Sequence, residues 1–217
     1  MSLSLVIANK RYSSWSLRPW LVMAEFGIPF TETLIPLDMP DTHARILAYS
    51  PSGRVPCLID GDVTVWDSLA ILERLAERFP EHAIWPRDPA ARAVARSVSA
   101  EMHAGFQALR QACPMNLVRE PNPIDRGEAA AADVVRIVQL WRDCRARFGA
   151  GGPFLFGAFS AADGMYAPVV HRLDRYGWAV EPDTRAYLDA VIALPSMQRW
   201  IAAAKEETWP NWAADVP

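Results

Sequence analysis

Cysteine is scarce in this chain, and its placement argues against several classes of protein. The 217 residues include three cysteines, Cys57, Cys113 and Cys144, which are odd in number and far apart. A disulfide-stabilised small domain or a cysteine-based metal site needs more cysteines at closer spacing, so we expect neither. A thioredoxin-like redox function would need a C-x-x-C motif near the first helical segment, and the sequence has none there.

A surplus of positive charge and a long apolar run are missing as well. The formal net charge is −3, and neither half of the chain carries more Lys and Arg than Asp and Glu. This composition gives little support to a nucleic-acid partner. The opening run "LSLVIA" is too short for a secretory signal and has no basic residue ahead of it. No stretch approaches the roughly 18 apolar residues of a membrane helix, so we expect a soluble, cytoplasmic protein.

The motifs of a serine hydrolase are absent. No G-x-S-x-G sequence occurs, and the four histidines, His43, His82, His103 and His171, are scattered along the chain. A serine nucleophile needs a base close by, and nothing in the sequence supplies one.

The first eighty residues alternate between strand and helix patterns. β-Branched and leucine-rich runs predict strands at 3–8 and 29–37, and "PCLIDGDVTVW" predicts a hairpin that turns at Asp60, Gly61 and Asp62. Apolar residues at helical spacing predict helices at 14–27, 41–51 and 67–79. The order β-α-β-α-β-β-α implies a small mixed sheet covered by helices.

After a proline-punctuated linker the pattern becomes wholly helical. Long helices are predicted over 90–112 and 125–149, shorter ones over 160–177 and within 183–207, and no convincing strand follows Pro89. We therefore predict an α/β domain at 1–80, a linker at 81–88 and an all-helical domain at 89–217. The end of the chain, "ETWPNWAADVP", either covers a cleft or is a frayed tail.

Three stretches of the first domain combine a structural and a functional interpretation. Val55-Pro56 either starts a strand with an ordinary trans proline, or is a cis turn that exposes the Val55 backbone to an extended ligand. Asp67 and Ser68 either cap a helix, or also hold the ammonium and carboxylate of an amino-acid head group. Three nearby serines either begin a helix, or also donate a hydrogen bond to an anion such as a thiolate: Ser13, Ser14 and Ser16.

Together these stretches resemble the soluble glutathione transferases, whose fold is a thioredoxin-like βαβαββα domain followed by an all-helical domain. "RYSSWSLR" is similar to the zeta-class loop Ser-Ser-Cys-Ser-x-Arg, "GRVPCL" to the Val-Pro loop and "DSLAILERL" to the Asp-Ser helix start. "PFLFGAFSAADGMYAPVV" resembles the capping-box region of the helical domain, where Ser160 and Asp163 have S-x-x-D spacing. The resemblance spans nearly the whole chain.

The resemblance implies a role for each matching residue. Ser13 would donate to the glutathione sulfur, with Ser14 and Ser16 supporting or replacing it. The Val55 backbone, before a cis Pro56, would pair with the cysteinyl unit. Further residues would bind the two ends of glutathione, or line the pocket of the second substrate. They are Asp67 and Ser68 at the γ-glutamyl end, Arg54 near the glycyl end, and Trp15, Met102, His103, Phe106, Arg110 and Asn116 in the second pocket.

The resemblance predicts a detoxifying transferase that joins glutathione, its co-substrate, to small hydrophobic electrophiles and forms a homodimer. No metal is expected. Trp15 stands where the zeta pattern has cysteine, and Gly53 where it has lysine. Two alternatives stay open: a glutathione-dependent enzyme that is either an isomerase of the maleylacetoacetate-isomerase type or a dehalogenase, and a non-catalytic ligand carrier or adaptor.

Overall fold

The computed structural model describes residues 2–209. Residues 210–217 lie outside this range, so the alternatives for most of the terminal "ETWPNWAADVP" stay open. Four strands form one mixed sheet in the order β2-β1-β3-β4. β1 pairs parallel with β2 and antiparallel with β3, and β3 pairs antiparallel with β4. The strands are β1 (Leu3–Ile7), β2 (Phe30–Leu34), β3 (Cys57–Asp60) and β4 (Val63–Trp66).

Alternation along β1 creates an apolar layer on each face of the sheet. Leu3, Leu5 and Ile7 join the main core, whereas Val6 joins a smaller cluster with Ile46 of the second helix. Successive side chains of a strand point to opposite faces, so one strand serves both layers. The helices of this domain are α1 (Ser14–Glu25), α2 (Thr42–Leu47) and α3 (Ser68–Arg78), in the predicted βαβαββα order.

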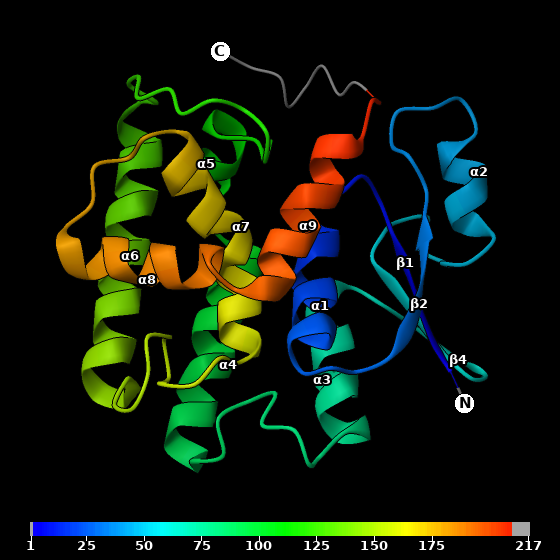
Figure 1. Ribbon diagram of the computed structural model, residues 1–217, viewed down its shortest axis with the longest axis horizontal. Coiled ribbons are helices and arrows are strands. Elements are labelled where there is room, and N and C mark those ends of the chain that lie inside the picture. Colours follow the sequence, from blue (N-terminus) through cyan, green and yellow to red (C-terminus); the bar gives the residue numbers. More distant parts are fainter. Residues whose placement is uncertain (1, 210–217) are drawn as a thin grey trace.

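The rest of the described chain is helical and lies beside the α/β part, with α1 and α9 between the two (Figure 1). Beyond Pro89, the only strand-like pairing in the described residues is two isolated bridges within 154–158. This arrangement confirms the predicted fold class, while the predicted domain limits stay a prediction. The helices are α4 (Pro89–Ala104), α5 (Gln107–Ala112), α6 (Glu128–Phe148), α7 (Ala161–Arg175), α8 (Pro182–Ile192) and α9 (Pro195–Glu206).

The predicted single helix over 90–112 is wrong, because the chain breaks between α4 and α5. Gly105 is extended and Phe106 adopts a left-handed conformation with φ of 60°. The Arg110 guanidinium turns back and donates to the carbonyl oxygens of Met102 and Gly105. These carbonyls lie at the C-terminal end of α4, where the helix itself supplies no N–H donor. Periodicity alone does not reveal such a break, since the apolar spacing continues across it.

The two parts are joined by a close approach of α7 to α1. Gly164 of α7 lies so near α1 that an added Cβ would be 2.5 Å from Cγ2 of Val22 and 3.3 Å from the Arg18 carbonyl oxygen. Both helices are buried at this point. Within residues 2–209, no helix is long and apolar enough to span a membrane.

Asp163 is expected to stabilise the fold through four hydrogen bonds. Its carboxylate accepts from Leu155 N, from Ser160 N and Oγ, and from the Tyr187 hydroxyl, all at 2.9–3.1 Å. Asp163→Ala leaves these buried donors without an acceptor, so we expect a loss of about 3 kcal/mol in the free energy of unfolding. Denaturant titration measures it. A loss below about 1 kcal/mol would show that the carboxylate is not needed, and Ser97→Ala, at an exposed hydroxyl of α4, is the control.

His171 of α7 should make stability depend on pH. Burial lowers its pKa from 6.5 to about 4, the Arg175 charge acts the same way and Asp174 opposes it. The unfolded chain therefore binds a proton that the folded chain does not, and stability is lost as pH falls from about 6.5 towards 4. We expect the unfolding free energy of the wild type to fall by roughly 3 kcal/mol relative to His171→Leu over this range. Parallel pH profiles would contradict the expectation.

Candidate active site

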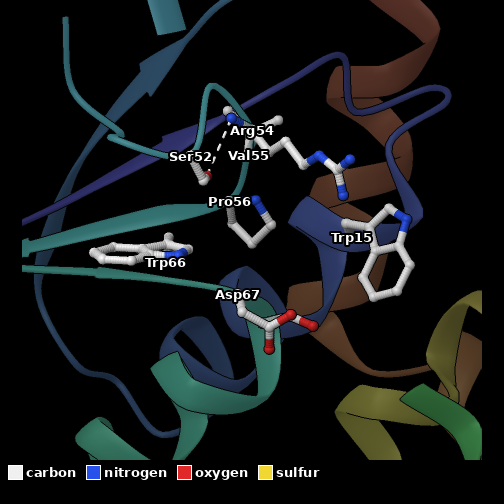
Figure 2. A pocket seen from close by; sticks show the side chains of 8 residues that line it. Trp15, Ser52, Arg54, Val55, Pro56, Trp66 and Asp67 are labelled. Carbon is white, nitrogen blue, oxygen red and sulfur yellow. Dashed lines mark hydrogen bonds between the residues drawn. The ribbon is translucent and has the colours of Figure 1, made fainter. Parts of the chain in front are cut away.

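One cavity of about 500 Å³ lies where three loop ends of the α/β domain meet. The sequence prediction named Arg54, Val55, Pro56, Asp67 and Ser68 for one binding site, and all five line this cavity. Figure 2 shows Trp15 on the α1 side, Trp66 on the strand side and the Asp67 carboxylate directed towards Trp15. Two further residues, Ser52 and Trp66, also line the cavity and had no predicted role.

The loop before β3 forms one wall of the cavity. The Val55-Pro56 peptide bond is cis, as the resemblance predicts. Proline cannot donate to a strand, and the Val55 backbone forms no hydrogen bond with the described part of the chain. Arg54 N donates to Ser52 Oγ at 3.2 Å, which holds the turn. The loop therefore offers a free backbone edge to an extended ligand.

The N-terminus of α3 forms the opposite wall. Asp67 is the N-cap residue and accepts from Leu69 N at 2.9 Å and Ala70 N at 3.4 Å. Its backbone has a φ of 78°, which aspartate tolerates better than most residues. Ser68 follows at the first helical position, where no acceptor within residues 2–209 takes its N–H. A carboxylate beside a free N–H and a hydroxyl suits a ligand that carries both charges.

The three serines of the loop before α1 are not equivalent. Ser13 caps the helix: its Oγ accepts from Ser16 N at 3.3 Å and donates to Ser16 Oγ at 2.8 Å. Ser16 Oγ in turn accepts from Ala8 N at 3.0 Å, which ties the helix to the end of β1. The Ser14 hydroxyl has no hydrogen-bond partner among residues 2–209. Ser14 is therefore the serine whose hydroxyl is unused within the described residues, and none of the three serines is among the residues that line the cavity.

The segment that leads into the serine loop is held by the C-terminal helical region. Glu207 accepts from Lys10 N at 2.6 Å and Arg11 N at 2.9 Å, and Trp200 Nε1 donates to Lys10 O at 2.9 Å. Asn116, predicted for the second-substrate pocket, accepts from Arg11 Nε at 3.4 Å. Its side chain is buried and supports the loop.

Two guanidinium groups lie close to the Trp15 ring. Arg18 is 4.2 Å from the centre of its rings and Arg110 is 5.0 Å from it, within the range of cation–π attraction. The His103 ring meets Trp15 edge-on at 5.3 Å, and its Nε2 lies 3.1 Å from Asp67 Oδ2. The structure thus brings Trp15, His103 and Arg110 of the predicted second pocket together beside the cavity.

Burial lowers the pKa of His103, Asp67 opposes this shift, and the charges of Arg18 and Arg110 add to it. The ring is accordingly neutral near pH 7. The other two predicted pocket residues are elsewhere: Met102 is fully buried in the main core and Phe106 is nearly so. The structure gives both a packing role and places neither along the cavity.

Sequence reasoning missed Arg18, although it is part of the matching loop pattern. A second signal was a cation in an otherwise apolar helix segment, between Leu17 and Pro19. Arg18 is fully buried, and its Nη1 donates to Ser68 Oγ at 3.3 Å. Within the described residues, no cluster of His, Cys, Asp and Glu could hold a metal ion. All three cysteines are free and buried, and burial raises the pKa of Cys144 to about 11.

Substitution of Asp67 should separate its capping role from its charge. Asp67→Ala removes the cap and leaves alanine at a positive φ, so we expect a loss of about 2 kcal/mol in unfolding free energy. Asp67→Asn keeps an acceptor and tolerates that backbone, so its loss should be less than half as large. Thermal and denaturant unfolding of both variants measures the difference. Equal losses would show that the charge, and not the cap, supports α3.

The sequence matches the description "Glutathione S-transferase, N-terminal domain" over residues 12–78 and its C-terminal counterpart over 125–203. It is 26% identical over 185 residues to glutathione S-transferase GstB of Escherichia coli, covering 82% of this chain and 88% of that protein. Maleylacetoacetate isomerase of Pseudomonas aeruginosa is 30% identical over 171 residues, 75% of this chain and 77% of its own.

Among solved structures, a glutathione transferase homologue from Burkholderia with bound glutathione shares the fold. The match has a TM-score of 0.73 and 24% identity and covers 96% of this chain and 100% of that one. Three findings agree with one another: the two domain matches in the expected order, the relative at 30% identity, and the fold shared with the Burkholderia structure. The chain belongs to the glutathione S-transferase family.

Proposed function

We propose that the protein is a glutathione transferase in which the Ser14 hydroxyl activates the thiol of bound glutathione. The observation that carries this proposal is that Arg54, Val55, Pro56, Asp67 and Ser68 line one cavity, because the loop before β3 and the N-terminus of α3 suit different parts of the tripeptide. Family membership supports the assignment of glutathione as co-substrate.

In the proposed binding mode, the free backbone of Val55 pairs with the cysteinyl unit, and Arg54 attracts the glycyl carboxylate. Asp67 binds the γ-glutamyl ammonium, while the Ser68 N–H and hydroxyl bind its carboxylate at the N-terminus of α3. The sulfur then lies towards the start of α1, where Ser14 has no partner within the described chain.

A serine hydroxyl is sufficient for the activation that we propose. A free thiol has a pKa of about 8.5 and is mostly protonated at neutral pH. A hydrogen bond to a charged acceptor contributes roughly 1.5–3 kcal/mol, which would lower this pKa by about one to two pH units. The N-terminal end of α1 adds about 0.3–1 kcal/mol in the same direction. The thiol proton is released to solvent and the thiolate attacks the electrophilic carbon. A C–S bond forms as the bond from that carbon to its leaving group breaks, the leaving group departs with the electron pair, and Ser14 stays neutral throughout.

The second substrate of this proposal is a small hydrophobic electrophile that contacts Trp15. A specific observation also supports the alternative, in which the substrate carries a carboxylate and is isomerised: the relative from Pseudomonas aeruginosa is named maleylacetoacetate isomerase. Arg110, which lies 5.0 Å from the centre of the Trp15 ring, supplies a positive charge that would attract such a carboxylate. Assays of both substrate types with one preparation decide between transfer and isomerisation.

We also propose a homodimer, as in the family that the sequence resembles.

The activation can be tested by titrating the ultraviolet thiolate absorbance of glutathione mixed with the protein. We expect a thiolate signal well below the pKa of free glutathione, and Ser14→Ala should return the titration towards that of the free thiol. Ser13→Ala is the matched variant: it removes the cap of α1 and should cost about 1 kcal/mol in stability while it keeps the low thiolate pKa.

Two outcomes would contradict the proposal in different ways. The absence of a thiolate signal at saturating glutathione would show that the protein does not activate the thiol, and it would favour a ligand carrier. A signal lost in Ser13→Ala and kept in Ser14→Ala, with both variants folded by circular dichroism, would assign the hydrogen bond to Ser13.

A further inference from the structure

Arg18 is a buried positive charge without an ion-pair partner. Its side chain is fully enclosed, and no carboxylate of the described chain pairs with it. Nη1 donates to Ser68 Oγ at 3.3 Å, while Nε and Nη2 have no acceptor. An unpaired ion inside a protein costs several kcal/mol, so the folded chain keeps this charge at an energetic cost.

The surroundings of Arg18 increase that cost. Burial lowers the pKa of Arg18 well below its usual value, the charges of Arg110 and Arg172 act in the same direction, and Asp67 opposes them. The Trp15 ring, 4.2 Å away, offsets part of the cost through its π-face. A negative charge brought close to Ser68 would therefore be attracted strongly, because the local field is positive and poorly screened by water.

Ser68 links this charge to the cavity. Its Oγ accepts from Arg18, so the hydroxyl proton is free to point to a ligand, and its N–H is also unpaired within residues 2–209. Ser68 lines the cavity next to Asp67, whose carboxylate is seen in Figure 2. A hydroxyl polarised by a guanidinium is a stronger donor than an isolated serine.

We propose that Arg18 is a positioning residue that acts through Ser68 to bind the α-carboxylate of the γ-glutamyl unit of glutathione. The inference rests on the proposed function and adds an element to it: a buried guanidinium behind the helix N-terminus supplies the charge that the hydroxyl alone lacks. In the free protein the charge is unpaired, and the ligand carboxylate compensates it. Recognition of this one carboxylate should accordingly depend on Arg18.

The experiment compares two ligands by isothermal titration calorimetry. One is glutathione, and the other is an analogue in which 4-aminobutyrate replaces the γ-glutamyl unit, so that only the α-carboxylate is missing. We expect the wild type to prefer glutathione and Arg18→Gln to lose at least about tenfold of this preference, which corresponds to about 1.4 kcal/mol. Arg18→Lys, which keeps the charge, should recover part of it.

Arg96→Met is the matched control. Arg96 also binds α3, through Glu73 at 2.8 Å, but at an exposed site away from Ser68. Its ligand preference should equal that of the wild type. A purely structural role of Arg18 would lower stability or weaken both ligands equally and would not move their ratio. If Arg18→Gln does not fold, the ratio measured for Arg18→Met replaces it.

The outcomes separate this inference from the function on which it rests. If the wild type binds neither ligand, the proposed glutathione site is wrong. If it binds glutathione in preference to the analogue and folded Arg18→Gln or Arg18→Met keeps that preference in full, the glutathione site stands and the role of Arg18 is wrong.

Discussion

The packing of α1 against α7 is the constraint on which the rest of the structure depends. Gly164 allows α7 to lie directly against Val22 and the Arg18 carbonyl, with no space for a further carbon atom. α1 therefore has one position relative to the helical part of the chain. Because α1 also covers the sheet, the serine loop at its N-terminus has a defined place relative to the loops that end at Pro56 and Asp67.

The second organising feature is an imbalance of charge beside the cavity. Arg18 and Arg110 both lie close to Trp15, and Arg172 is close enough to affect the pKa of Arg18. Asp67 opposes the pKa shifts of Arg18 and His103, and Asp133 opposes that of Arg110. A tripeptide with two carboxylates and one ammonium complements such a site, since it brings more negative than positive charge.

Much of the fold could be predicted from sequence because strand and helix patterns were uninterrupted and turn residues marked their ends. Arg54, Val55, Pro56, Asp67 and Ser68 could be predicted as one group because the Val-Pro and Asp-Ser motifs each lie at the end of an element of the same domain. The break at Gly105 could not, since it depends on the Arg110 side chain reaching back to the carbonyls of α4.

The roles of individual residues were harder to predict than their neighbourhood. Three adjacent serines look alike in sequence, and only their hydrogen bonds distinguish the cap from the free hydroxyl. Met102 has the spacing of a pocket residue, but its side chain is fully buried in the main core. Arg18 was missed because its partner, Ser68, is fifty residues further along the chain.

The contacts of Glu207 and Trp200 with Lys10 and Arg11 give the two ends of the chain a common role. The segment that follows β1 and the C-terminal end of α9 meet next to the loop that contains Ser14. The loop before α1 is therefore held by all of these contacts only after the ribosome has synthesised the chain as far as Glu207. A nascent chain that stops short of Trp200 has the residues of the cavity but not the groups that fix the loop beside it.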